Sequence, residues 1–255
     1  ANSMKTALFL GHGSPMNVLH DNPYNRAFRQ VGDSLPMPRA ILCVSAHGYG
    51  NGTWVSSSPR PELVYDFYGF PDALYQQQYP VSGCPELAEE VCRLLPHAQL
   101  DPDMGLDHGV WTVLKSMFPR ADIPVVQLSL NLMQPAQWHF DLAKKLAPLR
   151  EQGVLIVGSG NIVHNLRAFS PDAPPYGWAQ DFRLHINAAL QQGEFDRIAD
   201  YLNQWGEAAR LSAPTPEHFL PLLYALAQHD DGQAVELFND EIVGGALSMT
   251  SVRVN

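Results

Sequence analysis

Five of the ten histidines stand at turns that directly follow or precede apolar segments, and several have a glycine neighbour. They are His12, His47, His108, His164 and His218. Imidazole nitrogens suit Zn, Fe, Cu and Ni, whereas Mg and Ca prefer oxygen ligands. A single histidine at the end of a strand is more often a hydrogen-bonded structural residue, but several at equivalent positions indicate a shared function. The pattern predicts a transition-metal site of three or four histidines.

The other histidines and two further motifs give no competing site. His20, His97, His139, His185 and His229 lie on helical or polar segments without glycine flanks, so we assign them no role. Residues 157–161 resemble a nucleophile elbow, but Val157 replaces its first glycine, which disfavours serine hydrolysis. Residues 11–14 could cradle a phosphate, yet they lack the Walker lysine and the spacing of dinucleotide-binding glycines.

Four apolar runs predict the strands that position these histidines. The runs are 6–10, 40–46, 124–130 and 154–158. Nearly continuous apolar runs are typical of parallel strands that are covered on both faces. His12, His47 and His164 follow three of the runs, and ligands of open α/β sheets bind outside the carboxyl ends of the strands. We therefore expect the histidines to converge at one edge of a sheet.

The remaining patterns predict one more strand and several helices. Residues 246–254 alternate between apolar and polar, which indicates an edge strand. Helical periodicity appears in 85–95, 137–149, 178–192, 195–205 and 215–227. Pro148 should end the second helix early, Gly193 should stop the third, and Pro221 should kink or delay the last, in which Thr215 is the expected N-cap.

This succession of elements predicts an α/β domain with a central, mostly parallel or mixed sheet flanked by helices. We expect one catalytic domain over 4–255 and interpret residues 1–3 as a cloning remnant. The stretch 48–83 is rich in aromatic residues. It predicts either a wall or lid over a flat ligand, or a small hairpin packed on the sheet.

Composition excludes several classes of partner. The hydrophobic fraction of 45% supports one sizeable core, and no apolar run is long enough to span a bilayer. A formal net charge of −10 argues against nucleic acid and against an anionic membrane surface. The three cysteines, Cys43, Cys84 and Cys92, lack metal-binding spacing, so we expect a reduced, cytoplasmic protein.

Taken together, five motifs resemble the DOPA-dioxygenase-like branch of the class III extradiol ring-cleavage dioxygenases. The motifs span residues 11–16, 45–47, 107–109, 161–166 and 214–222, in the order of that family. The similarity runs from about Leu8 to Val252. Each motif alone is weak, but the ordered combination is specific.

The resemblance implies a mononuclear non-haem Fe(II) site on an α/β fold, with Zn(II) able to occupy the site after purification. It implies that His12 and His47 are metal ligands and that His218 holds the third ligand position. His164 would sit beside the metal, as a fourth ligand in a zinc form or as the acid/base in turnover. His108 would lie just behind the ligands or contact the substrate and oxygen.

Two positions depart from the pattern of this family. Better-known class III enzymes use two histidines and a glutamate, whereas this chain has His218 at the carboxylate position with Glu217 beside it. Gly48 follows His47 where members usually carry a large aromatic residue. The pocket is then expected to be wider, or Tyr49 takes over the role.

Three functions are consistent with these residues. The first is ring opening of a DOPA-like catechol by dioxygen, with His164 as the base and aromatic residues of 65–79 stacking on the ring. The second is a zinc hydrolase that acts on a small amide, ester or cyclic compound. The third is a binding protein without turnover. We favour the first, with a small aromatic diol and dioxygen as partners and a monomer or small homo-oligomer as the assembly.

Overall fold

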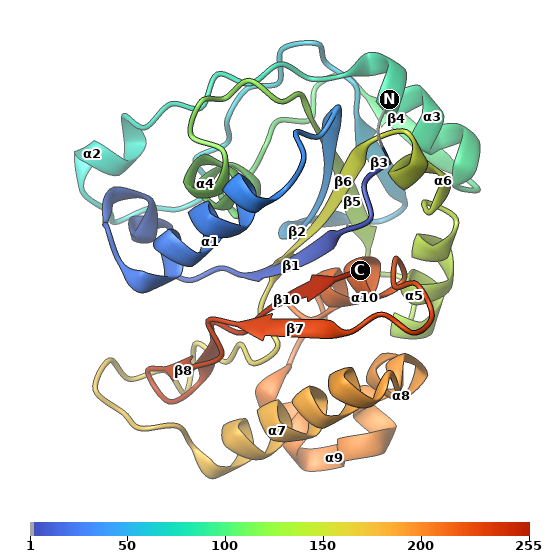
Figure 1. Cartoon of the computed structure of the whole chain (residues 1–255). Helices are drawn as coiled ribbons and strands as arrows, with labels where there is room; N and C mark the ends of the chain where they lie inside the picture. The colour runs from blue at the N-terminus through green and yellow to red at the C-terminus, as the bar shows by residue number, and fades with distance from the viewer. Residues whose placement is uncertain (1–2) are drawn as a thin grey trace.

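The computed structural model describes residues 3–255 and is built on one eight-stranded mixed sheet (Figure 1). Its strand order is β4-β3-β5-β2-β6-β1-β10-β7. The strands are β1 (Ala7–Gly11), β2 (Ala40–Gly50), β3 (Thr53–Ser56), β4 (Ala98–Asp101), β5 (Val125–Asn131), β6 (Val154–Gly160), β7 (Val235–Phe238) and β10 (Ser251–Val254), and β8 (Ile242–Val243) pairs with β9 (Leu247–Ser248). Residues 1 and 2 of the predicted cloning remnant lie outside the described residues.

The four predicted buried strands are confirmed as β1, β2, β5 and β6, which lie at the centre of the sheet. β2 runs parallel to both β5 and β6, and β6 runs parallel to β1. Leu8 of β1 pairs with Val157 of β6, and both side chains are buried in the core on the same face. The carboxyl ends of β1, β2 and β6 therefore meet at one edge, as the sequence predicts.

The predicted edge strand at the C-terminus is wrong in its position. β10 lies inside the sheet, antiparallel to both β1 and β7, and β7 forms the edge instead. Three of the polar residues in this run, Ser248, Thr250 and Ser251, are buried and hydrogen-bonded. The Ser251 hydroxyl accepts the Gly11 N–H at 2.9 Å, and the Thr250 hydroxyl donates to Asp240 at 2.6 Å.

The helices begin and end close to several of the predicted limits. They are α1 (Pro23–Ser34), α2 (Asp72–Tyr75), α3 (Pro85–Leu94), α4 (His108–Met117), α5 (Ala136–Lys144), α6 (Pro148–Glu151), α7 (Gly177–Gln192), α8 (Phe195–Ala199), α9 (Tyr201–Ser212) and α10 (Leu220–Leu226), with a 3₁₀ turn at Pro15–Leu19. Gly193 ends α7 with a φ of 71°, and α5 ends before Pro148, as predicted.

Two helical predictions need correction. The predicted helix over 195–205 is two helices, α8 and α9, because the backbone of Asp200 between them is not helical. The Asp200 carboxylate accepts hydrogen bonds from the side-chain amides of Asn203 and Gln204 in the first turn of α9. Thr215 does not cap a helix: its hydroxyl donates to Glu217 at 2.8 Å, and α10 starts only at Leu220. The delayed start that Pro221 predicted is confirmed.

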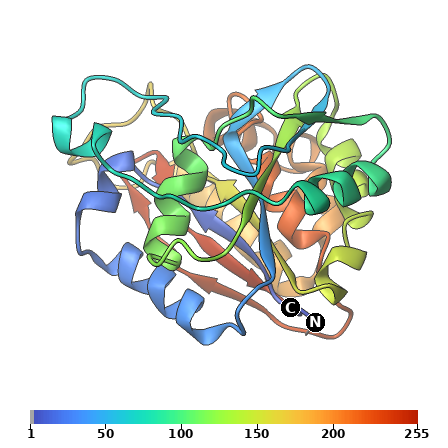
Figure 2. The same ribbon diagram turned by 90° about the horizontal axis from the view of Figure 1, so that it is seen from above.

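Helices cover both faces of the sheet (Figure 1), and the view from above shows the twisted strands between them (Figure 2). One apolar core joins α1 and α4 to the face that carries Leu8. The other joins α5, α7 and α10 to the opposite face, which carries Phe9. Within residues 3–255, no helix is long and apolar enough to cross a membrane.

His139 on α5 is a structural residue, in agreement with the absence of a predicted role. Its side chain is fully buried, and Nδ1 lies 2.7 Å from the Tyr224 hydroxyl of α10. Burial lowers the pKa of His139 from 6.5 to about 4. Between pH 6.5 and pH 4, His139 is protonated in the unfolded chain but neutral in the folded protein. Protonation therefore favours the unfolded chain, and the free energy of unfolding decreases as the pH falls through this range.

We predict that His139→Gln removes the part of the pH dependence of the unfolding free energy that His139 contributes. The difference in unfolding free energy between pH 7 and pH 4 should shrink by about 3 kcal/mol relative to the wild type. Urea unfolding at a series of pH values measures it, with His20→Gln, a change at an exposed histidine, as the control. An unchanged pH dependence in His139→Gln would contradict the assignment.

Candidate metal centre

His12 follows β1 and is fixed by the neighbouring strand β6. Its backbone N–H donates to the Gly160 carbonyl at 3.1 Å, and its Nδ1 lies 2.9 Å from the Ser159 hydroxyl. When Nδ1–H donates to this hydroxyl, the lone pair of the ring is on Nε2. The His12 ring is buried and directs Nε2 toward His47.

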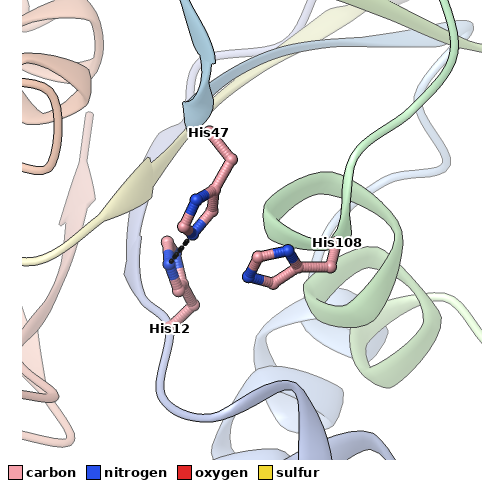
Figure 3. Close-up of side chains that lie close together, drawn as sticks. All are labelled: His12, His47 and His108. Atoms are coloured by element: carbon pink, nitrogen blue, oxygen red, sulfur yellow. Dashed lines mark hydrogen bonds between the residues drawn. The ribbon is translucent and has the colours of Figure 1, made fainter. Parts of the chain in front are cut away.

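His47 belongs to β2, which continues past its predicted end to Gly50. The register of β2 against β5 shifts between Val44 and Tyr49, so the strand is irregular where the histidine lies. The Nε2 atoms of His47 and His12 are 3.2 Å apart, and Figure 3 shows the two rings meeting at these nitrogens. Two lone pairs at this distance repel one another unless a proton or a cation lies between them.

His108 is the first residue of α4, where the sequence predicts a turn. Its ring points toward the other two histidines (Figure 3), and its centroid is 4.0 Å from that of His47. The ligand atoms of His12, His47 and His108 lie within 4.8 Å of one another. Asp66 holds His108 in place, since its Oδ1 accepts the His108 backbone N–H at 2.9 Å and lies 2.8 Å from Nδ1.

His218 reaches the same place from the turn before α10. Asn161, which follows β6, donates its backbone N–H to the His218 carbonyl at 2.8 Å. The turn packs directly on β6 because Gly158 and Gly160 have no side chain: a Cβ there would collide with the carbonyls of Pro221 and His218. The glycines that suggested a nucleophile elbow thus have a packing function.

His164 stacks on His218, with ring centroids 3.4 Å apart and planes inclined by 8°. The His218 centroid is 5.0 Å from that of His47 and 5.6 Å from that of His12. Both ring nitrogens of His218 are buried without a hydrogen-bond partner among the described residues. Leaving a buried imidazole without hydrogen bonds costs free energy. A partner from outside the protein, such as a bound cation, would satisfy this ring.

The surroundings of four of these histidines lower the imidazole pKa and so favour the neutral form; the four are His12, His47, His164 and His218. Burial, together with repulsion from the neighbouring imidazoles, lowers the pKa of His12 well below its usual value. Burial and His108 lower the pKa of His47 to about 3, and burial and His218 lower the pKa of His164 to about 3. A neutral imidazole is the form that binds a metal ion, so these lowered pKa values leave the ring nitrogens able to bind a metal at neutral pH.

The residues fit a transition metal on geometric grounds. Zinc–nitrogen distances of about 2.0–2.1 Å place two ligand nitrogens roughly 3.0–3.5 Å apart at tetrahedral angles. The distance of 3.2 Å between the Nε2 atoms of His12 and His47 lies in this range. The donor set is imidazole nitrogen, which suits Fe and Zn and not Mg or Ca.

A hollow of about 280 Å³, here called the histidine hollow, opens onto the five histidines. Its other walls are largely apolar and include Phe70, Leu166, Phe169 and Leu247. The Phe67 ring meets His108 edge-on, with centroids 5.6 Å apart. The aromatic stretch 48–83 therefore supplies part of the wall that the sequence predicts. The volume and the largely apolar lining of the histidine hollow suit a small aromatic molecule.

A second hollow of about 420 Å³ lies on the other side of His47. Tyr49 and Trp54 line this second hollow and not the histidine hollow, so Tyr49 does not take over the predicted aromatic position. At Gly48 the space of a Cβ is occupied by the side-chain amide of Gln127, which would have to move to admit a side chain there. The departure at Gly48 thus makes room for a buried polar network.

That network fixes the relative positions of two histidine-bearing segments. The Asp107 carboxylate accepts hydrogen bonds from the Ser45 hydroxyl at 2.7 Å, the Gln127 amide at 2.6 Å and the Gly109 N–H at 2.8 Å. Ser45 also accepts the backbone N–H of His47 at 3.1 Å. Asp107 caps α4 directly before His108, so one buried carboxylate ties β2 to α4.

All five histidines selected from the sequence lie at one site. Of the residues that hold them, Ser45 and Asp107 belong to two of the family motifs and Ser159 to the rejected nucleophile elbow, but none of these motifs indicates a supporting role, and Asp66 belongs to no motif. The only signal for Asp66 is its place in the aromatic stretch 48–83. Asn131, the last residue of β5, does not line the histidine hollow, although β5 belongs to the same sheet.

We predict that Asp107→Asn destabilises the protein by about 1–3 kcal/mol, because an amide cannot accept all three donors and one buried hydrogen bond is lost. Metal affinity should fall as well, since His47 and His108 are no longer held together. Urea unfolding and zinc titration measure the two effects, with the exposed Asp103→Asn as the control. An unfolding free energy and a zinc affinity equal to those of the wild type would rule out the proposed role of Asp107 in joining β2 to α4.

Comparisons with known proteins agree with this geometry. A family described as the catalytic LigB subunit of aromatic ring-opening dioxygenase matches residues 6–252. The 4,5-DOPA dioxygenase extradiol of Escherichia coli (strain K12) is 46% identical over 256 residues, which cover 97% of this chain and 94% of that protein. The 4,5-DOPA dioxygenase extradiol of Portulaca grandiflora is 36% identical, covering 98% of this chain and 96% of its relative.

A solved structure is similar over the same length. The crystal structure of the uncharacterized Escherichia coli K12 protein JW3007 has a TM-score of 0.86 at 44% identity and covers 98% of this chain and 99% of that one. The resemblance found in the sequence motifs is confirmed, and the chain belongs to the LigB family of aromatic ring-opening dioxygenases.

Proposed function

We propose that this protein is a metal-dependent extradiol dioxygenase that opens the ring of a DOPA-like catechol with dioxygen. The observation that carries the proposal is the pair of Nε2 atoms 3.2 Å apart on His12 and His47, beside the buried and unpaired ring of His218. Membership of a family of ring-opening dioxygenases supports the reaction class. The names of the relatives support a catechol as the substrate.

In this proposal His12, His47 and His218 hold the metal, Fe(II) in turnover with Zn(II) as an alternative occupant. A metal bound by these residues would lower the pKa of the diol and would supply a common binding place for the catechol and dioxygen. His218 is proposed as the third ligand because the motif that carries it resembles the ligand position of the family, and because Nε2 of its buried ring has no hydrogen-bond partner; its Nδ1 lies 3.7 Å from the Glu217 carboxylate. Both atoms of dioxygen end in the ring-opened semialdehyde acid.

His164 is the proposed acid/base. It lines the histidine hollow and stacks on His218, so its imidazole lies where it could take a proton from a catechol hydroxyl made more acidic by a bound metal. His108 is proposed to contact the substrate, since its ring lines the histidine hollow and is held by Asp66. Phe70 and Phe169 would pack on the faces or edges of the catechol ring and exclude water.

The remaining features of the proposal concern the setting of the enzyme. The three cysteines are free, which suits a reducing cytoplasm. We propose a monomer or small homo-oligomer as the assembly. Neither feature changes the chemistry at the histidines.

We predict oxygen uptake by metal-free protein that has been reconstituted anaerobically with one equivalent of Fe(II) and then given air and a catechol such as DOPA. Uptake should track the absorbance of a yellow ring-opened product and should be absent with Zn(II). A zinc hydrolase with the same histidines would consume no oxygen. No uptake with any catechol, from protein shown to hold one iron, would contradict the dioxygenase assignment.

We predict that two histidine variants separate ligand from base. His218→Ala should lose metal at least tenfold more readily than the wild type, whereas His164→Ala should retain most of its iron and lose turnover by a factor of about 100 or more. Metal analysis after gel filtration and oxygen uptake measure the two properties, with His20→Ala as the control. Wild-type turnover in His164→Ala would remove the proposed base, and full metal retention in His218→Ala would remove the third ligand.

A further inference from the structure

Phe169 forms part of the wall of the histidine hollow where the hollow meets the solvent. Phe169 and Leu166 both line the hollow and are 38% and 63% exposed, whereas His12 and His218 at its inner end are buried. A catechol whose hydroxyls face the histidines would direct the opposite edge of its ring outward. A substituent on that edge would therefore meet Phe169 and Leu166.

The Phe169 ring lies directly on the backbone of Gly244. Gly244 has a φ of 58°, and a Cβ built on it would overlap three carbon atoms of the Phe169 ring. The next residue, Gly245, has a φ of 77°, and a Cβ there would collide with the ring of Tyr176. Two aromatic rings can pack on this turn because both of its residues are glycines.

Hydrogen bonds hold the segment that carries Phe169 against the same two glycines. The Ser170 N–H donates to the Gly244 carbonyl at 3.0 Å, and the Tyr176 N–H donates to the Gly245 carbonyl at 3.1 Å. The Tyr176 hydroxyl donates to the carbonyl of Ala168, the residue before Phe169, at 2.7 Å. These contacts make the Phe169 ring a fixed part of the wall.

The segment that carries Gly244 is in turn attached to the histidine site. The Asn165 N–H donates to the Ala246 carbonyl at 3.0 Å. Leu247, which lines the hollow, forms an antiparallel β-bridge with His164. The position of Phe169 relative to His164 is therefore set by backbone contacts on both sides.

The histidine hollow is small for a ligand site. Its volume of about 280 Å³ lies just below the range of about 300–1,000 Å³ that is typical of small-molecule sites. The part of its wall away from the histidines is largely apolar, so it distinguishes ligands by shape. Pressing a wide group against a rigid apolar wall costs free energy, as overpacking does in a protein core.

We infer that Phe169, positioned by Gly244, determines the width of the ring substituent that the histidine hollow admits. Phe169 excludes catechols whose substituent is branched where it joins the ring. The inference rests on the proposed function, because it places the diol at the histidines. It concerns shape alone: at equal carbon number, an unbranched chain passes the Phe169 ring and a branched one collides with it.

The test compares 4-butylcatechol with 4-tert-butylcatechol, which have the same composition and differ only in branching. Calorimetry on the Zn(II)-loaded protein measures both Kd values without turnover. The wild type should bind the unbranched ligand about tenfold more tightly or better, the effect of one steric collision. Phe169→Ala removes the ring and should reduce this preference to about twofold or less.

A second substitution tests whether Gly244 positions the ring. Gly244→Ala must displace the Phe169 ring and should change the preference by about threefold or more, whereas the same change made in Phe169→Ala should alter it by less than about twofold, because no ring is left to displace. Tyr176→Phe removes the hydrogen bond to Ala168 without adding an atom, and it should weaken the preference for the unbranched ligand. This variant tests the positioning of the ring even if Gly244→Ala does not fold.

Gly232→Ala is the matched control. Gly232 has a φ of 83°, but a Cβ there would meet no atom within 4 Å, and Gly232 lines neither hollow. This variant has the same backbone strain as Gly244→Ala and should keep the wild-type preference.

Equal Kd values for both ligands in the wild type, or an unchanged preference in Phe169→Ala, would overturn the inference while leaving the catechol site in place. Equal effects of Gly244→Ala with and without the Phe169 ring would overturn the role of Gly244. A wild type that binds neither ligand would overturn the catechol site itself, and the inference with it.

Discussion

Close approach of uncharged imidazoles is the constraint on which this structure depends. Five histidines from distant parts of the chain share one buried site, and such a cluster is stable only while its rings are neutral or joined by a cation. Burial lowers the pKa of His47 and His164 to about 3, which removes the charge, and the Nε2 atoms of His47 and His12 then lie 3.2 Å apart with at most one proton between them. A transition metal bound by both nitrogens would take the place of that proton, so the fold and the proposed chemistry depend on the same contacts.

The supports of the site are arranged around this constraint. Ser159 on β6 orients the His12 ring, and the Asp107 carboxylate joins the strand of His47 to the helix that begins at His108. Glycines on β6 let the turn of His218 pack against the strand. Each support comes from an element different from the histidine that it holds, so the geometry of the site is only as rigid as the packing between the sheet and its helices.

The sequence predicted the parts of the fold that depend on local pattern. Continuous apolar runs identified β1, β2, β5 and β6, and hence the edge where the histidines meet. It could not place β10 inside the sheet, since that position depends on pairing with β1. The two strands are far apart in the sequence: Gly11 and Ser251, which are hydrogen-bonded, are separated by 240 residues. Asp66 was missed for the same reason: its role comes from a contact with His108 across 42 residues, which no spacing rule contains.

The most direct test of the metal centre is anomalous X-ray diffraction from crystals of the protein loaded with one equivalent of Zn(II), recorded at the zinc absorption edge. We expect one strong peak about 2.0–2.1 Å from the Nε2 atoms of His12 and His47, with the His218 ring as the third ligand. No peak at this position, or a peak held by cysteines or surface carboxylates instead, would contradict the metal centre and the dioxygenase chemistry built on it.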